Sequence, residues 1–474
     1  MIRSARLGNV GRVVFPLLIV AGILVLPAHS QQGTAGSPIK PAPITFTEIT
    51  SRLHVGLPPV SHRSGTVTLP VSIRSQEYSL GYARSVLVPV IGGSIAVGDF
   101  NGDGLGDLYV VVPGGVNHLL QQARDGTFAD VTEKASAKGT GSDLAATFGD
   151  FDKSGRASLF VAGLGGVTLY HNNGDGTFAD ITAKAGLKGK SGELATSILL
   201  FDADGDGFPD LLVTIYTDFS NPPTKASFTF PNDFAGANSR LYRNQHDGTF
   251  VDVTESAGLA ENPGRTHMAL AADFNHNGRA DLLLLRDNKP PALFRNQGQG
   301  KFEDRTWDAG KEIWKYAYVQ GQIADFNHDG KPDAALWSTI GNEVLINQGD
   351  GKFDQEDSLP LVYAANRAFG FHGLAADLEG DGYDDLLTVD KNEHWHFIVN
   401  KKGEFEESSL QWILEPGTPD AAHETEPALV SLTATHLGQS KEIALIGLTA
   451  EGRIRIFKSE PARNSGQRRK ARGK

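Results

Sequence analysis

A nine-residue acidic pattern that recurs along the chain is the feature that most limits its fold. The pattern reads D-x-[DN]-x-[DN]-G-x-x-D, and its intact or degraded copies begin at residues 99, 150, 202, 273, 325 and 377. Successive copies start 51, 52, 71, 52 and 52 residues apart, and a near-constant period of this size predicts a repeat architecture. The one long interval predicts an insertion, which we assign to residues 214–238.

Each repeat has the same internal order of apolar and turn residues. A stretch rich in small residues precedes most acidic loops, an apolar run follows, and two further apolar segments come next, often around an Asp-Gly pair. Asp-Gly pairs between apolar runs predict tight hairpins. Four strand-length pieces in about 50 residues predict a β-propeller blade, in which small side chains suit the crowded strand nearest the axis.

Six acidic loops predict six blades, and the two ends of the repeat region predict a seventh. Residues 428–459 keep the strand rhythm but have lost the acidic residues, and they supply only three strands. Residues 44–50 resemble the outer strand of the other repeats, and we expect them to complete that blade. The prediction is an all-β, seven-bladed β-propeller of four-stranded antiparallel blades over residues 44–459, closed by the N-terminal strand; six or eight blades are the alternatives.

The segments outside the repeats predict an exported protein. Residues 1–30 combine Arg3, Arg6 and Arg12 with about 14 apolar residues and a small-residue site, which predicts a signal peptide cleaved near Ser30. A membrane anchor is the alternative, but a spanning helix needs roughly 20 apolar residues. We expect residues 31–43 to be a flexible leader, residues 460–474 a disordered basic tail, and the mature protein to be secreted or periplasmic with no membrane span.

The composition excludes several kinds of bond, metal site and binding partner. The chain has no cysteine, which excludes disulfides, thiolate metal sites and a cysteine nucleophile. Its formal net charge is −12, so the protein should repel nucleic acid and attract cations. We expect a monomer.

The acidic loops have the donor pattern of a calcium loop. Counted from the first Asp, side-chain oxygens stand at positions 1, 3, 5 and 9, and Gly at position 6 permits a sharp turn. Hard oxygen donors in this spacing match the first nine residues of an EF-hand loop, but no Glu stands at position 12 and strands flank the loop. The alternative is that Asp and Asn only cap turns, and six copies in register argue against it.

We rank the loops by the number of carboxylates. The loop from Asp150, with Ser154 and Ser158, is marginal, and the seventh blade should bind nothing. From strongest to weakest, the predicted structural Ca²⁺ ligands are Asp202, Asp204, Asp206 and Asp210; Asp377, Glu379, Asp381 and Asp385; Asp99, Asn101, Asp103 and Asp107, equal to Asp325, Asn327, Asp329 and Asp333; and Asp273, Asn275, Asn277 and Asp281.

On these loops and on segments such as "LYRN" followed by "DGTFVDVT", the chain resembles the FG-GAP or VCBS repeat family. That family includes the integrin α-subunit head, and secreted bacterial and cartilage acidic protein types look most similar. The resemblance covers residues 44–459 and implies a propeller whose loops bind calcium. It does not identify a partner, because propellers of this family recognise varied ligands.

Three features could carry a second function. His394 and His396 share one strand face, where they could ligate a metal ion or could be ordinary surface residues of the strand. His276 and His328 stand at loop position 4, and we expect them to point to solvent and assign them no role. The aromatic insertion at 214–238 could bind a partner or pack over the blade edge. Trp307 and Trp314 could line a binding rim, although packing between blades is the expected reading.

We expect a secreted calcium-binding propeller that acts as a binding or adhesion scaffold for an extracellular protein or glycan. No hydrolase, zincin or phosphate-loop motif stands in a suitable context, so we assign no catalytic residues and expect no enzyme. The alternatives are a polysaccharide lyase or hydrolase and a lectin with pockets between blades.

Overall fold

A computed structural model describes residues 44–53 and most of 93–461. Between 54 and 92 it describes only residues 55, 57, 73, 74 and 88. The proposed signal peptide and leader lie outside the described residues, as does the basic tail from residue 462 onward; residues 460 and 461, which the prediction assigned to the tail, end the last strand instead. Within 93–461 the gaps are 113, 224–226, 229–232, 261–262, 312, 314–315, 339–340, 357–358, 361, 363–372, 391, 393, 416–425 and 441.

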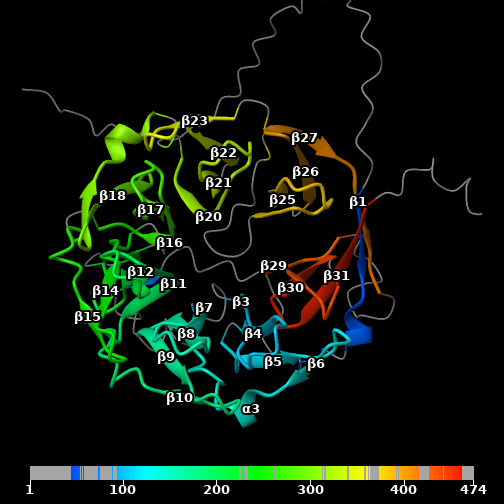
Figure 1. The fold of residues 1–474 in the computed structure, drawn as a ribbon, viewed down its shortest axis with the longest axis horizontal. Helices are drawn as coiled ribbons and strands as arrows, with labels where there is room; N and C mark the ends of the chain where they lie inside the picture. The colour runs from blue at the N-terminus through cyan, green and yellow to red at the C-terminus, as the bar shows by residue number, and fades with distance from the viewer. Residues whose placement is uncertain are drawn as a thin grey trace, which may run out of the picture. The chain divides into compact units, whose positions relative to one another are not determined.

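Residues 44–461 form seven β-sheets arranged around a common centre, which confirms the predicted seven-bladed propeller (Figure 1). Each of the first six blades is a four-stranded antiparallel sheet whose first strand lies nearest the centre. From the centre outward, the first three blades are β3 (Ser94–Gly98), β4 (Asp107–Val111), β5 (His118–Gln122) and β6 (Phe128–Asp130); β7 (Asp143–Gly149), β8 (Ser158–Gly163), β9 (Gly166–Asn172) and β10 (Phe178–Asp180); and β11 (Glu193–Phe201), β12 (Asp210–Asp218), β14 (Arg240–Asn244) and β15 (Phe250–Asp252).

The next three blades repeat this plan. Every acidic loop joins the first and second strands of its blade, as the repeat pattern predicts. The strands are β16 (Thr266–Ala272), β17 (Asp281–Arg286), β18 (Ala292–Gly298) and β19 (Lys301–Asp304); β20 (Tyr318–Ala324), β21 (Asp333–Ser338), β22 (Asn342–Asn347) and β23 (Phe353–Gln355); and β24 (Gly373–Ala376), β25 (Asp385–Val389), β26 (Trp395–Lys401) and β27 (Glu404–Ser408).

The seventh blade is closed by the N-terminal strand, in agreement with the prediction. Strands β29 (Ser431–His436), β30 (Ile443–Leu448) and β31 (Ile454–Pro461) are antiparallel, and β1 (Ile44–Glu48) pairs antiparallel with β31. These are the four predicted strands of the blade, and β28 (Leu410–Ile413) adds a fifth strand parallel to β1. The seventh blade thus contains strands from both ends of the propeller segment, β1 and β31, together with β28, which follows the sixth blade along the chain.

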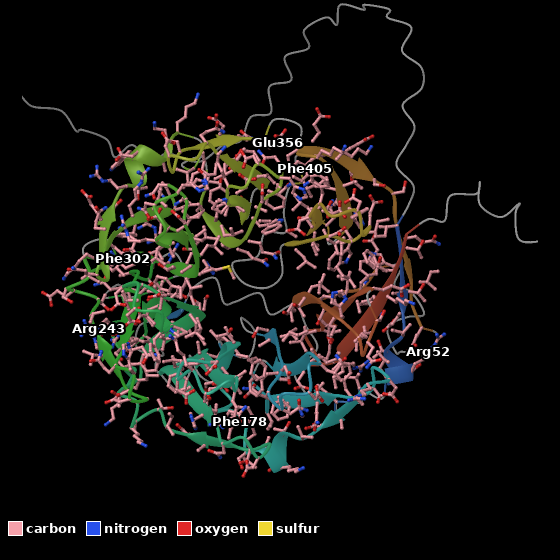
Figure 2. The ribbon with its side chains drawn as sticks, viewed as in Figure 1. Arg52, Phe178, Arg243, Phe302, Glu356 and Phe405 are labelled. Carbon is pink, nitrogen blue, oxygen red and sulfur yellow. The ribbon has the colours of Figure 1, made fainter. Side chains whose placement is uncertain are left out.

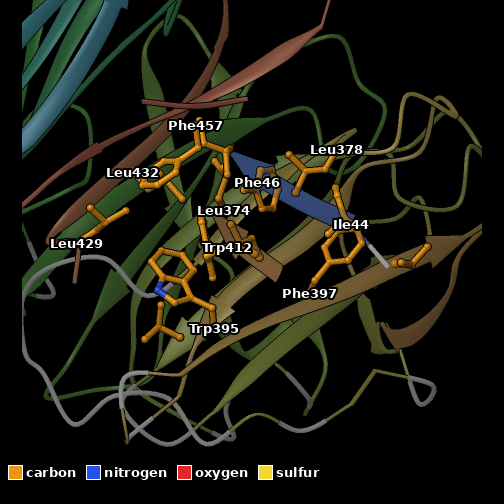
Figure 3. Close-up of a cluster of buried hydrophobic side chains, with 14 residues drawn as sticks. Ile44, Phe46, Leu374, Leu378, Trp395, Phe397, Trp412, Leu429, Leu432 and Phe457 are labelled. Carbon is orange, nitrogen blue, oxygen red and sulfur yellow. The ribbon is translucent and has the colours of Figure 1, made fainter. Parts of the chain in front are cut away.

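Aromatic packing reinforces this closure (Figure 3). Phe46 of β1 stacks on Trp412 of β28 with ring centroids 5.0 Å apart, and Trp412 meets Phe457 of β31 at 4.9 Å. Phe397 of the sixth blade belongs to the same buried cluster. Such pairs contribute about 0.5–1.5 kcal/mol each beyond the burial of their area.

One apolar cluster lies between each pair of neighbouring blades. The Phe of each "DGTF"-type turn is buried on an outer strand, as for Phe178, Phe302 and Phe405 in Figure 2. Each of these rings packs against the preceding blade, for example Phe178 against Phe100 at 5.8 Å between ring centroids. The core is therefore distributed between sheets.

Small residues allow the inner strands to approach one another, as predicted. A Cβ atom built on Gly98 of β3 would lie 2.6 Å from Phe148 of β7, and one on Gly149 would lie 2.2 Å from Leu200 of β11. A real Cβ does not tolerate such contacts. Between the fifth and sixth blades the Gln322 side chain also hydrogen-bonds the backbone of Ala375, through its Oε1 at 2.6 Å and its Nε2 at 3.2 Å.

The insertion in the third blade differs from its predicted bounds. Residues 214–218 continue strand β12, so Tyr216 belongs to the blade. Phe219 and Phe234 are buried and meet edge to face at 5.4 Å, which is the packing alternative. Within the insertion, β13 (Ser227–Phe228) pairs with β2 (Ile73–Arg74), a segment that precedes the first blade.

Short helical turns connect the blades. They are η1 (Thr50–Leu53), α3 (Thr132–Ala135) and η3 (Thr306–Ala309). Trp307 lies on η3 and is 82% exposed, so the expected packing between blades is wrong. The reason is that Thr306 and Ala309 are the buried residues of this turn, which leaves Trp307 outside; Trp314 lies outside the described residues. No helix in the described part of the chain is long and apolar enough to cross a membrane.

Candidate metal sites

The first Asp of each acidic loop organises the turn. Its Oδ2 accepts the backbone N–H of the Gly at position 6 in all six loops, as in Asp202 with Gly207 at 2.8 Å. Gly207 has φ of 84°, a left-handed conformation that favours glycine. These contacts hold the loop in its sharp turn and leave further lone pairs on the carboxylate.

The Asp at position 9 is buried at the start of the second strand. Asp210 is 1% exposed, and its Oδ1 accepts the backbone N–H of Asn244 on the third strand at 2.8 Å. Its Oδ2 accepts the N–H of Ala203, at loop position 2, at 2.9 Å. The same pair of contacts recurs at Asp107, Asp333 and Asp385.

Burial makes these carboxylates costly to ionise without a cation. Burial raises the pKa of Asp385 to about 8, and the charges of Glu379 and Asp381 add to the effect. Burial likewise raises the pKa of Asp107 to about 7 and that of Asp210 to about 6. A bound cation favours the ionised form of such groups, so the pattern fits a metal loop.

The fourth loop gives the most direct fit to a metal. Asn275 Oδ1 at position 3 and Asp281 Oδ2 at position 9 are buried, and neither has a hydrogen-bond partner among the described residues. The N–H of Phe274, which would otherwise reach Asp281, donates to Ala272 instead at 3.0 Å. Buried oxygens without donors are suitable ligands for Ca²⁺, which binds carboxylate and amide oxygens.

The third loop brings its candidate ligands closest together. Ligand oxygens of Asp202, Asp204 and Asp210 all lie within 4.8 Å of one another, and they form the one such group of three found in the described part of the chain. Burial and the nearby charge of Asp206 raise the pKa of Asp204. This is the loop that the sequence ranks first.

The second loop has replaced its ninth carboxylate by a hydroxyl. Ser158 Oγ accepts the backbone N–H of Asn172 at 3.1 Å and so keeps the structural contact without the charge. Asp152 Oδ2 lies 2.8 Å from His171 Nε2, and Asp206 of the third loop has the same kind of contact with His246 at 2.6 Å, so the hydroxyls at positions 5 and 9 are what distinguish the second loop. The arrangement agrees with a marginal site. In the seventh blade, Glu442 is the acidic residue among the described residues of the corresponding turn, and it pairs with Lys458 at 2.5 Å.

A buried asparagine that the sequence analysis did not assign links each of the first five loops to the next blade, and at the sixth loop Ser459 Oγ of the seventh blade donates to the carbonyl of Leu378 at 3.0 Å instead. Asn172 Nδ2, on the third strand of the second blade, donates to the carbonyl of Phe100 in the first loop at 2.7 Å. Asn244, Asn296, Asn347 and Asn400 make the same contact to the preceding loop. In the sequence, each of these Asn residues stands just before a hairpin turn, and this recurring position was the signal from which the contact could have been predicted.

The sequence analysis named four histidines, and the structure shows where each of them lies. His276 and His328 are exposed, as predicted, but the His328 ring also stacks on Tyr383 of the next loop at 3.8 Å between centroids. Both have positive φ, of 55° and 57°. His394 and His396 follow a hairpin turn, and Trp395 between them is buried.

A polar pocket of about 1040 Å³ lies beside the third blade, at the ends of the insertion. Asp218 and Asn221 line one part of it, and residues 235–238 line another. Arg240, which also lines the pocket, hydrogen-bonds Glu193. The insertion therefore packs on the blade, which is the packing alternative, and its ends also border this pocket.

The repeat, the loops and the blades together define a β-propeller built from FG-GAP-type repeats. The family described as FG-GAP-like repeat matches residues 99–161, 150–213, 273–336 and 325–388, each span running from one loop into the next blade. This chain is an FG-GAP repeat β-propeller protein.

Three curated relatives are cartilage acidic protein 1 of different animals. The proteins of Mus musculus and Homo sapiens are each 27% identical over 172 residues, which is 35% of this chain and 26% of the relative. The Xenopus tropicalis protein is 26% identical over 158 residues, 31% of this chain and 24% of the relative. The chain thus spans about a quarter of the length of the curated relatives it matches.

Solved structures also show similarity at low identity. An Agrocybe aegerita lectin that recognises non-reducing terminal N-acetylglucosamine is 20% identical, with a TM-score of 0.43 over 67% of this chain and 79% of that chain. BBS1N, solved in complex with ARL6DN, is 11% identical, with a TM-score of 0.45 over 79% of this chain and 95% of that chain.

Proposed function

We propose that this protein is an exported, calcium-loaded propeller that binds an extracellular protein or glycan. The observation that carries the calcium part is the pair of buried oxygens in the fourth loop, Asn275 Oδ1 and Asp281 Oδ2, which have no donor among the described residues. The buried Asp at position 9 of four further loops supports it, since each is surrounded by other acidic side chains.

Export is supported by the N-terminal segment and the relatives. Residues 1–30 have the charge and apolar pattern of a signal peptide. Millimolar calcium outside the cytoplasm suits loops of this type, whose extracellular examples bind with dissociation constants of roughly 0.1–1 mM. The relatives are named as acidic proteins of cartilage, which agrees with an extracellular setting.

The pocket beside the third blade is the site we propose for the ligand. It is formed where the chain departs from its repeat, and long insertions on a rigid scaffold often carry binding. Its lining includes Asp218, Asn221, Asn238 and Arg240, which offer both donors and acceptors. Such a lining favours a hydroxylated ligand such as a glycan over an apolar one.

A binding screen tests the proposal. The purified protein is applied to glycan arrays and to extracellular-matrix proteins, in calcium and in EDTA. The variant Ala235→Trp places a bulky ring in the pocket, because Ala235 is exposed and lines it, while Ala129→Trp places the same bulk at an exposed position on β6. Binding that Ala235→Trp abolishes and Ala129→Trp retains supports the pocket. Binding unaffected by both variants contradicts it, and product release from polysaccharides would support the enzyme alternative.

A further inference from the structure

The turn between β25 and β26 fixes one carboxylate beside two histidines. Asp390 Oδ1 accepts the backbone N–H of Asn392 at 2.8 Å and that of His394 at 2.9 Å. Its Oδ2 lies 3.6 Å from His396 Nε2 and 3.9 Å from His394 Nδ1. The backbone thus holds Asp390 in place, and its Oδ2, which also accepts a bond from Asn392 Nδ2 at 3.3 Å, faces both rings.

His396 is oriented from behind by a second carboxylate. Its Nδ1 lies 2.7 Å from Glu407 Oε1 on the neighbouring strand β27. In the neutral tautomer that donates from Nδ1 to Glu407, the lone pair lies on Nε2. A histidine that donates one N–H to a carboxylate is the usual orientation of a metal ligand.

The other nitrogen of His396 has no hydrogen-bond partner among the described residues. His396 Nε2 is buried and lacks a hydrogen bond among the described residues, and 3.6 Å to Asp390 Oδ2 is beyond hydrogen-bond distance. An imidazole lone pair and a carboxylate oxygen therefore face each other. A shared cation would satisfy both groups, whereas a proton on Nε2 would make only a long ion pair.

We propose that Asp390, His394 and His396 bind one divalent transition-metal ion, of the zinc or copper class, with Glu407 supporting His396. Imidazole nitrogens favour these ions over Ca²⁺, which prefers oxygen. The two histidines are two residues apart at the start of a strand, so they share a face while Trp395 enters the core. The ligand atoms of these three residues do not all lie within 4.8 Å of one another, so the His394 side chain, which is 66% exposed, has to turn toward the ion.

The site is independent of the proposed calcium loops. It lies between the second and third strands of the sixth blade, whereas the loop from Asp377 joins the first and second. Three protein ligands leave a fourth position for water or for a side chain of a binding partner. The ion would cross-link the turn to β27 through Glu407.

Calorimetric titration with ZnCl2 tests the site in the full chain, at saturating calcium so that the acidic loops are occupied. Wild type should bind one zinc ion per chain that Asp390→Asn and His396→Ala lose. Asp390→Asn keeps an oxygen for the two turn hydrogen bonds, so its fold should be retained, as the melting temperature without zinc would show. Glu407→Gln should weaken binding 10–100-fold. Visible absorption of bound Co²⁺ gives a second readout.

His118→Ala is the matched control, because His118 Nδ1 lies 2.8 Å from Asp130 and forms a similar histidine–carboxylate pair. It should bind zinc as wild type does. Zinc binding that is equal in wild type and His396→Ala would overturn the proposal. Binding that excess calcium abolishes would assign the ion to the acidic loops and would also overturn it.

Discussion

The side-chain amide of Asn296 donates a hydrogen bond to the carbonyl oxygen of Ala203 in the preceding blade, at 2.9 Å. A second bond from the same amide reaches Ala280, in its own acidic loop, at 3.0 Å. The backbone N–H of Asn296 donates to Asp281 at 2.7 Å. One buried residue therefore links the third loop, the fourth loop and the ninth-position carboxylate.

The residue at loop position 2, whose carbonyl accepts the bond from the Asn side chain, also packs on the next blade. Phe274 at loop position 2 offers its carbonyl to Asn347 at 2.9 Å, and its ring meets Phe353 of that blade at 5.2 Å. The relationship recurs at Phe100, Phe151 and Phe326. A change in the conformation of an acidic loop should therefore alter the packing between its blade and the next one.

Replacing Asn296 by Ala should destabilise the ring. The substitution leaves the carbonyls of Ala203 and Ala280 without their donor, and a buried unsatisfied group costs about 1–3 kcal/mol. Denaturant unfolding measures the loss. Asn173→Ala, which removes an exposed Asn bonded to Thr177, should stay within about 0.5 kcal/mol of wild type. Equal stability of the two variants would show that the link contributes nothing.

Removing one charge from the third loop should weaken metal binding without unfolding the blade. Asp204→Asn keeps an oxygen to accept the N–H of Asp206 and relieves the repulsion that raises the Asp204 pKa. Calcium titration should show one site weakened at least tenfold, while the melting temperature in EDTA stays equal or rises.

The exposed Asp247 in the hairpin of the same blade supplies the control for that titration. Asp247→Asn removes the same charge from a turn that holds Thr249, outside the acidic loop. Calcium binding should be unchanged. If both variants bind calcium as wild type does, Asp204 is not a ligand.

The ion pair that closes the seventh blade should make stability depend on pH. Glu48 of β1 is 3% exposed, and its carboxylate accepts bonds from Arg455 Nε at 3.0 Å and Nη2 at 2.8 Å. Burial alone raises the pKa of Glu48, but bonds from Arg455, Glu415 and Thr50 outweigh it and leave the pKa below its usual value. The pair therefore contributes fully above the unfolded pKa of about 4.3 and is lost as the pH falls through the folded pKa.

Glu48→Gln should remove that acid-sensitive contribution. It leaves Arg455 buried without its counter-charge, and breaking a buried pair costs about 3–5 kcal/mol. Unfolding curves at pH 7 and pH 4 measure the difference between wild type and variant, which should shrink at the lower pH. An undiminished difference at pH 4 would show that the charge of Glu48 is not responsible. Glu404→Gln, at an exposed position on β27, should match wild type at both pH values.

The blades were predictable because each repeat carries its own turn residues. Asp-Gly pairs such as Asp175 and Gly176 lie in the hairpin between β9 and β10, and the acidic loops lie between first and second strands. Residues 44–50 could be assigned to the last blade because they repeat the outer-strand pattern, and β1 spans Ile44–Glu48. Signals of this kind lie in the local sequence and repeat along the chain, so they can be recognised without knowledge of tertiary contacts.

Features that depend on long-range contacts were not predictable. Strand β28 has no counterpart in the other repeats, so no periodicity marks its parallel pairing with β1. Trp307 looked like an apolar core residue, and only the orientation of η3 shows that it is exposed. Asp390 became a neighbour of His396 through the turn between them, a geometry that a two-histidine pattern does not specify.

Thermal unfolding in calcium and in EDTA tests the central claim most directly. At millimolar calcium each site should contribute roughly 1 kcal/mol, so five loops predict a fall of roughly 5 °C in the melting temperature when EDTA is added. Calcium should restore the loss, and magnesium should restore less of it, because Mg²⁺ demands near-ideal octahedral geometry and gives up its waters reluctantly. A melting temperature that EDTA leaves unchanged would contradict the account, since the acidic loops would then hold their blades without a cation.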